Sequence, residues 1–217
     1  MIVGMWMTRD PVTIEPQTPL AEAAHLMSQH KIRRLPVVCP TGGALHLEGL
    51  VSATDVYRAC PPDCNPFSPG ALERFPAGLT AGQIMIRAPL TTTSGAPIED
   101  VAMLMRDRKI GALPVLNDQE GLIGVITESD IFRAFVGILG DHSSGVRVTF
   151  KTSDGEDLFG LLAEVVRGRK VRVVSLISSR HENSVLSVVR LVGQDAESVI
   201  DRLWSTGHQA LNVLRWS

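Results

Sequence analysis

The chain has 217 residues, of which 44% are hydrophobic and 20% are charged, a composition typical of folded globular proteins rather than disordered ones. A formal net charge of −2 gives no broad basic surface, so we expect no nucleic-acid partner. No apolar run approaches the roughly 18 residues of a transmembrane helix, so we expect no membrane partner. The three cysteines are too few for a disulfide framework, which favours a cytoplasmic protein with reduced thiols.

An internal repeat organises the first two-thirds of the chain. The segment that begins at Met5 matches the segment that begins at Gln83, with Met7 over Met85 and Pro36 over Pro114. The first copy then has three extra residues in a Pro-Thr-Gly-Gly stretch that is typical of a hairpin loop. After this insertion, Gly49 aligns with Gly124. The alignment indicates one unit repeated twice, over residues 1–60 and 81–139.

Both copies show the same predicted order of elements. In the first copy, Thr18 and Pro19 are typical of a helix start, and apolar residues at helical spacing predict a helix over 20–30. Two short apolar strands follow at 33–38 and 49–51, and the second runs directly into another helix. Because neither copy looks large enough to bury a good core alone, we expect an α+β fold of two β-α-β-β-α repeats packed face to face.

The remaining segments differ from the repeats in composition. Residues 61–80 are dense in proline and glycine, which predicts a connecting surface loop, and residues 140–145 form a second break. Beyond this linker, residues 146–217 show strand-like and helix-like patterns in the order βαββαβ. That order predicts a ferredoxin-like unit.

Two matched tetrads carry the candidate chemistry. Ser52 and Asp55 follow the second strand of the first copy, and Thr127 and Asp130 hold the same places in the second. The spacing is a capping pattern, in which the hydroxyl and the carboxylate satisfy free backbone amides of a helix. The same helix start can instead receive a phosphate beside the hydroxyl, while the carboxylate accepts both hydroxyls of a ribose. Because the pattern occurs twice at equivalent places, we favour the ligand-binding interpretation.

These segments resemble a tandem pair of cystathionine β-synthase (CBS) domains, a regulatory module that binds adenine nucleotides in many proteins. The motifs are M-T-x-x-P-V-T from Met7, K-I-x-x-L-P-V from Lys31 and G-h-h-[ST]-x-x-D from Gly49, and all three recur between Met85 and Asp130. The resemblance implies that Ser52 and Thr127 contact phosphate and that Asp55 and Asp130 bind ribose. The residues that it places around the adenine are Val12, Thr13, Leu35, Pro36 and Val37 in the first copy and Leu90, Thr91, Leu113, Pro114 and Val115 in the second.

The two copies differ where the phosphate is expected. Arg33 and Arg34 stand in the first copy where Gly111 and Ala112 stand in the second. In the resembled family a basic residue at the second of these positions often reaches phosphate, so Arg34 is a candidate phosphate ligand. The alternative is a solvated pair at a helix end. We expect charged nucleotides to prefer the first site, and the second to hold a less charged adenosyl ligand or none.

The C-terminal segment resembles an ACT domain, a ferredoxin-like module that senses amino acids and related metabolites. The first loop of that family reads D-x-P-G-x-L-A-E-h, which residues 157–165 match except at Phe159. Asp157 and Gly160 are therefore candidates for a ligand loop, and the alternative for Gly160 is close packing of a helix on the sheet. Two CBS domains followed by an ACT domain is the arrangement of the acetoin-utilisation protein B family, which the chain resembles over nearly its whole length.

The sequence favours a regulatory ligand-sensing protein over an enzyme. We expect AMP, ADP, ATP or S-adenosylmethionine at the CBS pair, and either homodimerisation or a second small metabolite at the ACT domain. We expect no required cofactor, no catalytic residue and no metal site, since Cys60 and Cys64 lack a nearby histidine or second cysteine pair. Two alternatives stay open: a partner-binding scaffold whose sites are empty, and a nucleotide hydrolase that uses Asp55 or Asp130.

Overall fold

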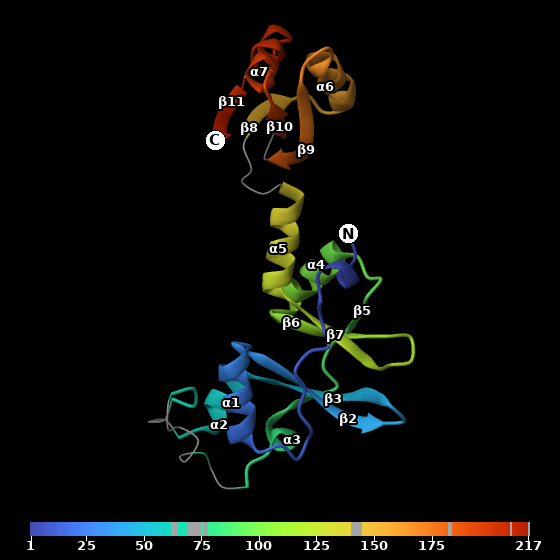
Figure 1. The fold of residues 1–217 in the computed structure, drawn as a ribbon, viewed down its shortest axis with the longest axis vertical. Helices are drawn as coiled ribbons and strands as arrows, with labels where there is room; N and C mark the ends of the chain where they lie inside the picture. The colour runs from blue at the N-terminus through green and yellow to red at the C-terminus, as the bar shows by residue number, and fades with distance from the viewer. Residues whose placement is uncertain are drawn as a thin grey trace. The chain divides into compact units, whose positions relative to one another are not determined.

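The protein divides into two units, Met1–Arg133 and Ala134–Ser217. The computed structural model describes residues 1–61, 65–68, 75, 78–139, 145–181, 184–208 and 210–216, and Figure 1 traces the chain. Within these ranges no helix is both long enough and apolar enough to cross a membrane.

The first unit contains the two repeats with the order of helices and strands that the sequence predicts. The first repeat has α1 (Leu20–His30), β2 (Arg34–Thr41), β3 (Ala44–Ser52) and α2 (Ala53–Ala59). The second has α4 (Ile98–Arg108), β6 (Ala112–Leu116), β7 (Leu122–Thr127) and the start of α5 (Glu128–Leu139). Short elements precede each repeat: η1 (Val3–Met5) and β1 (Thr8–Arg9) before the first, and α3 (Ala81–Ile84), β4 (Ile86–Arg87) and β5 (Thr92–Thr93) before the second.

Helix α1 packs on its own repeat through the face that the spacing of its apolar residues predicts. Leu20, Ala23, Ala24 and Met27 are buried, and they share one core with Leu35, Val37 and Val51 of the neighbouring strands. The second repeat buries Ile98, Val101 and Met105 of α4 in the same way. The buried stripe holds the helix against the sheet and so fixes where its C-terminal end lies.

Each repeat contributes its leading strand to the sheet of the other repeat. Strand β1 pairs antiparallel with β7, with Thr8 opposite Val125, and β4 pairs antiparallel with β3, with Gly49 opposite Arg87. The resulting sheets have the orders β1-β7-β6-β5 and β2-β3-β4. Backbone hydrogen bonds of two sheets therefore join the repeats.

The glycines and methionines of the repeated motifs meet where the exchanged strands cross. A Cβ atom on Gly49 would stand 2.6 Å from the sulfur of Met85 and 2.9 Å from the carbonyl oxygen of Ile86. A Cβ atom on Gly124 would stand 2.9 Å from the sulfur of Met7 and 2.8 Å from the carbonyl oxygen of Thr8. Glycine is required at both positions because the neighbouring strand leaves no room for a side chain.

The second unit begins with the last residues of α5, Ala134–Leu139, and beyond them its described residues form one antiparallel sheet with helices α6 and α7. Its elements are β8 (Gly145–Thr152), α6 (Leu158–Val166), β9 (Val171–His181), β10 (Ser184–Gly193), α7 (Ala196–Ser205) and β11 (Ala210–Trp216), and the strand order is β11-β8-β10-β9. Alternate residues of β8 and β10 share one core with Val165 of α6 and Leu203 of α7. Both helices therefore cover the same face of the sheet.

Two predicted connections fall partly outside the described residues. The described part of the loop predicted at 61–80 contains no helix and no strand. Of the linker predicted at 140–145, residues 140–144 lie outside the described residues, and Gly145 opens β8.

Candidate functional site

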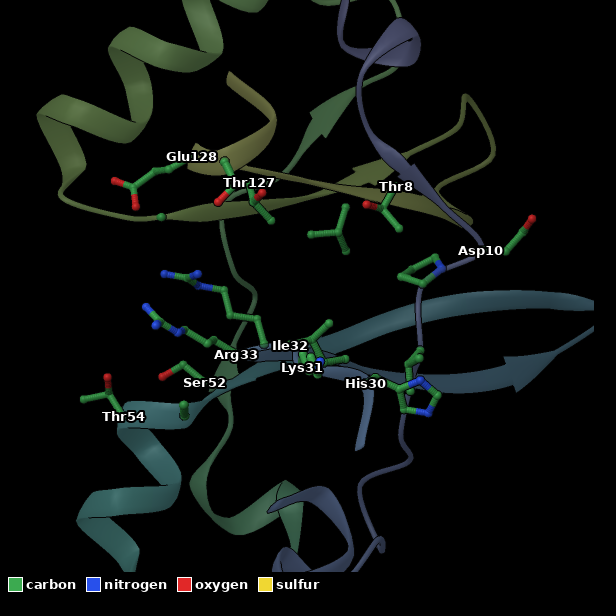
Figure 2. A pocket seen from close by; sticks show the side chains of 17 residues that line it. Thr8, Asp10, His30, Lys31, Ile32, Arg33, Ser52, Thr54, Thr127 and Glu128 are labelled. Carbon is green, nitrogen blue, oxygen red and sulfur yellow. The ribbon is translucent and has the colours of Figure 1, made fainter. Parts of the chain in front are cut away.

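A cavity of about 840 Å³ in the first unit is lined by both repeats. Figure 2 shows Arg33, Ser52 and Thr54 on one side of this space and Thr127 and Glu128 on the other. The first repeat contributes His30, Lys31, Ile32, Arg33, Arg34, Ser52, Ala53 and Thr54, the second contributes Gly111, Val125, Thr127, Glu128 and Ser129, and the N-terminal segment contributes Thr8, Asp10, Pro11 and Val12.

The hydroxyls of Ser52 and Thr127 stand at the starts of α2 and α5. Ser52 donates from its backbone N–H to Asp55 Oδ2 at 2.9 Å and from its hydroxyl to the same oxygen at 2.6 Å, and the N–H of Asp55 donates back at 3.3 Å. Thr127 and Asp130 repeat this geometry at 2.8, 2.7 and 3.3 Å. Both tetrads are therefore capping boxes, and their hydroxyls also line the cavity.

The two capping carboxylates differ in their remaining oxygen. Asp130 is only 5% exposed, and its Oδ1 accepts a 2.8 Å bond from Arg133, which also donates to the carbonyl oxygen of Trp6. Arg58 is the matching arginine of the first repeat, and among the described residues it forms no ion pair with Asp55. Asp55 therefore keeps a carboxylate oxygen that neither its cap nor an arginine occupies. Neither aspartate lines the cavity.

The side chain of Arg34 extends from the first repeat to the second. Its Nη2 contacts the point where a Cβ atom of Gly111 would stand, and Glu128 Oε2 lies 2.7 Å from the same point. Burial lowers the pKa of the Arg34 guanidinium, whereas the carboxylate of Glu128 raises it and the charge of Arg33 lowers it. The guanidinium of Arg34, expected to distinguish the first site, thus lies against Gly111, the second repeat's equivalent of Arg33.

Left-handed backbone at Lys31 and Asp10 shapes the cavity wall. Their φ angles are +54° and +46°, and the equivalent residues Lys109 and Ala88 have φ of +54° and +44°. Residues other than glycine rarely adopt this conformation, so its recurrence in both repeats is a property of the repeated unit. No glycine marks these positions, so no sequence pattern indicates left-handed backbone at Asp10 or Lys31.

The repeats match a known family. Residues 3–61 and 81–137 match the model of the CBS domain, which together is more than half of the chain. This chain belongs to the CBS-domain proteins.

Curated relatives cover mainly the CBS pair. A CBS domain-containing protein of Dictyostelium discoideum is 31% identical over 143 residues, which are 64% of this chain and 94% of that protein. An uncharacterized protein of Methanocaldococcus jannaschii is 29% identical over 136 residues, 62% of this chain and 47% of that protein. The L-aspartate semialdehyde sulfurtransferase of the same organism is 27% identical over 131 residues, 60% of this chain and 22% of the enzyme. The chain thus spans less than half the length of two of these three relatives.

Solved CBS pairs share the fold of the first unit. A CBS domain pair in complex with 5′-methylthioadenosine and S-adenosyl-L-methionine is 27% identical, with a TM-score of 0.51 over 63% of this chain and 97% of that chain. CBSX2 in complex with AMP is 28% identical, with a TM-score of 0.52 over 64% and 98%. The Vibrio cholerae protein assigned as acetoin utilization protein AcuB is 28% identical, with a TM-score of 0.52 over 64% and 94%.

The cavity of this CBS pair brings together only part of the predicted ligand-binding set. Val12, Arg34, Ser52 and Thr127 line it. Leu90, the equivalent of Val12, is 47% exposed and does not. The remaining predicted residues also lie outside the lining: Thr13, Leu35, Pro36, Val37, Asp55, Thr91, Leu113, Pro114, Val115 and Asp130.

Several further lining residues lie within the recurring motifs themselves. Thr8 follows Met7 in the M-T motif, and Lys31 and Ile32 open the K-I motif. Thr54 and Glu128 lie inside the two capping tetrads. The motifs therefore locate the cavity more reliably than they identify the residues that line it.

In the second unit, Asp157 and Gly160 form a helix cap. Asp157 precedes α6, and its carboxylate accepts a 2.9 Å bond from the N–H of Gly160. A Cβ atom on Gly160 would collide with that carboxylate, so the glycine makes room for the cap rather than for packing on the sheet. Phe159, which stands where the ACT motif has proline, is 80% exposed. Of the two cysteines considered for zinc, Cys60 is buried and Cys64 lies outside the described residues.

Proposed function

We propose that this CBS-pair protein is a regulatory sensor that binds an adenosine-containing ligand in the cavity between its repeats. The observation that carries the proposal is the convergence of the Ser52 and Thr127 hydroxyls with three cations, Lys31, Arg33 and Arg34, on one space. Its volume of about 840 Å³ lies within the range of small-molecule sites.

Each group has a role that its chemistry suits. The hydroxyls of Ser52 and Thr127 each have one proton, which they donate to the capping aspartates; on binding they would turn that proton to a phosphate oxygen. A guanidinium such as that of Arg34 forms charge-assisted bonds to the same phosphate group. Asp55 does not line the cavity itself but is partly exposed next to Thr54, which does, and its oxygen outside the cap would accept a ribose hydroxyl. Val12 lines the cavity and would offer an apolar surface to the base. The related CBS pairs that hold AMP, or 5′-methylthioadenosine and S-adenosyl-L-methionine, support this class of ligand.

Binding without catalysis is the function that the site supports best. A hydrolase that used Asp55 or Asp130 would need the carboxylate as a base or nucleophile facing the ligand. Both carboxylates instead accept two bonds from a hydroxyl-bearing neighbour and hold a helix start. That arrangement favours a sensor over a hydrolase, and we propose that this sensor is cytoplasmic and needs no further cofactor.

For the second unit we propose a ferredoxin-like, ACT-type domain. The element order βαββαβ and the strand order β11-β8-β10-β9, with both helices on one face, support this assignment. Its role would be homodimerisation or the binding of a second small metabolite near Asp157 and Gly160. Ligand in the first unit would regulate the protein if it favoured one arrangement of the repeats over another, since only differential affinity shifts such an equilibrium.

Calorimetry of the full chain with AMP, ADP, ATP and S-adenosylmethionine tests the sensor directly. We expect saturable binding of at least one of them, with GMP as a control for the base. No binding to any of the four would favour the partner-binding scaffold. A parallel incubation with ATP, followed by chromatography of the nucleotide, should return ATP unchanged, and accumulation of ADP or AMP would favour the hydrolase.

A further inference from the structure

The two repeats place different side chains at one equivalent point of the cavity wall. The N–H of Ala53 donates to the carbonyl oxygen of Arg33 at 2.8 Å, and the N–H of Glu128 donates to that of Gly111 at 3.2 Å. Ala53 and Glu128 are therefore structural equivalents as well as sequence equivalents, and both line the cavity. The first repeat presents a methyl group where the second presents a carboxylate.

Glu128 and Arg34 share one space above Gly111. Glu128 Oε2 lies 2.7 Å from the point where a Cβ of Gly111 would stand, and the guanidinium of Arg34 contacts the same point. Any side chain at position 111 would displace both charged groups, so the glycine makes their approach possible. Figure 2 shows Glu128 extending into the cavity from the second repeat, across from Arg33 of the first.

A ligand phosphate that approaches Arg34 must compete with this carboxylate. Glu128 already offers Arg34 a negative charge, and it repels each negative charge that the ligand brings into the same space. The repulsion grows with the number of ligand charges, whereas the contacts of the adenosine moiety stay the same. Lys31 and Arg33 in the same lining attract phosphate, whereas Glu128 repels it. Glu128 therefore limits how much the affinity increases from adenosine through AMP and ADP to ATP.

We propose that Glu128 is a specificity-determining residue that lowers affinity in proportion to the negative charge of the ligand, and so favours adenosyl ligands of low negative charge. This inference rests on the proposed function, since it concerns the same cavity. It goes beyond that function by assigning the charge selectivity to one residue outside the motif positions implied by the family resemblance.

The test is calorimetry of wild type and Glu128→Gln with adenosine, AMP, ADP and ATP. We expect the substitution to raise affinity about tenfold for ATP, about threefold for AMP and less than about twofold for adenosine, because removing one charge matters most to the most charged ligand. The gain should shrink at high salt. Glu99→Gln is the matched control, because Glu99 lies in the first turn of α4, is exposed and does not line the cavity.

An Arg34→Gln background separates competition from general repulsion. If Glu128 competes for that guanidinium, Glu128→Gln should gain less ATP affinity there than in wild type, and equal gains would overturn the competition. If wild type binds these ligands and Glu128→Gln binds adenosine, AMP, ADP and ATP with the same relative affinities as wild type, the specificity role of Glu128 is overturned and the proposed function stands. No binding of any of these ligands or of S-adenosylmethionine to wild type would overturn the proposed function, and this inference with it.

Discussion

Arg133 donates a 2.8 Å hydrogen bond to Oδ1 of Asp130, the carboxylate oxygen that does not take part in the helix cap. Asp55, the equivalent aspartate of the first repeat, has no such partner among the described residues. The repeats therefore differ in whether a capping aspartate can still accept a ribose hydroxyl. The difference gives a second source of asymmetry, independent of Arg33 and Arg34.

Replacing Arg133 should raise the ligand affinity of the part of the site that the second repeat forms around Thr127 and Asp130. Asp130 is 5% exposed and does not line the cavity, and Arg133→Gln removes the side chain that covers its Oδ1. One hydrogen bond gained by the ligand there, of about 1 kcal/mol, predicts about a fivefold higher affinity at the site that binds AMP more weakly. Calorimetric titration with AMP measures this change. Arg58→Gln is the matched control and should leave both affinities as they are. An unchanged weaker site in Arg133→Gln would leave Asp130 with its capping role alone.

Asp55→Ala should weaken ligand binding and helix capping together. Loss of hydrogen bonds to a charged group predicts about 1.5–3 kcal/mol of binding free energy, and loss of the cap predicts about 1 kcal/mol of the free energy of unfolding. Calorimetry gives the first quantity and urea denaturation the second. A variant that loses stability but binds AMP as tightly as wild type would show that Asp55 has no contact with ribose.

Gly49→Ala should destabilise the crossing of β3 and β4. The added methyl would stand 2.6 Å from the sulfur of Met85 and 2.9 Å from a backbone oxygen, so overpacking of about 1–3 kcal/mol is expected. Thermal unfolding should show a lower Tm. Gly95→Ala is the control, because no atom lies within 4 Å of its added methyl and we expect a change within about 0.5 kcal/mol. Equal stability of both variants would contradict the role assigned to the crossing.

The full chain should be a homodimer in solution. Phe132 and Val136, one helical turn apart on α5, are exposed apolar side chains, and exposed apolar groups can mark a protein interface. Trp204 of α7 is a further exposed apolar side chain. Light scattering at micromolar concentration, with and without AMP, should report twice the chain mass of 23.5 kDa. A mass of one chain under both conditions would exclude the dimer.

The sequence predicts much of the fold because a pattern found in one repeat can be checked against the same positions of the other repeat. The helix over 20–30 and the strand before Ser52 follow from patterns that recur in both copies, and the structure has both. The exchange of β1 and β4 is not predictable in this way, because a two-residue strand has no periodicity to read. Its partner is fixed only when the two repeats fold together.

The candidate site is predictable only where it follows a motif. Ser52 and Thr127 were selected by their spacing, and both line the cavity. Arg34 and Glu128 approach each other from far apart in sequence, and each stands where the other copy has alanine, so no pattern within one repeat points to their approach. Leu35 and Val37 were expected beside a base, and the structure buries them in the core of the first repeat instead of the cavity wall.

The reciprocal pairing of β1 with β7 and of β4 with β3 interlocks the repeats independently of the peptide connection between them. A backbone cut within residues 61–80 should therefore leave two fragments that stay associated and keep the cavity. Removal of residues 1–9 should instead destabilise the second repeat, which is the later one in sequence, by taking away an outer strand of its sheet. The first residues to be synthesised therefore complete the sheet of the second repeat, which is synthesised last.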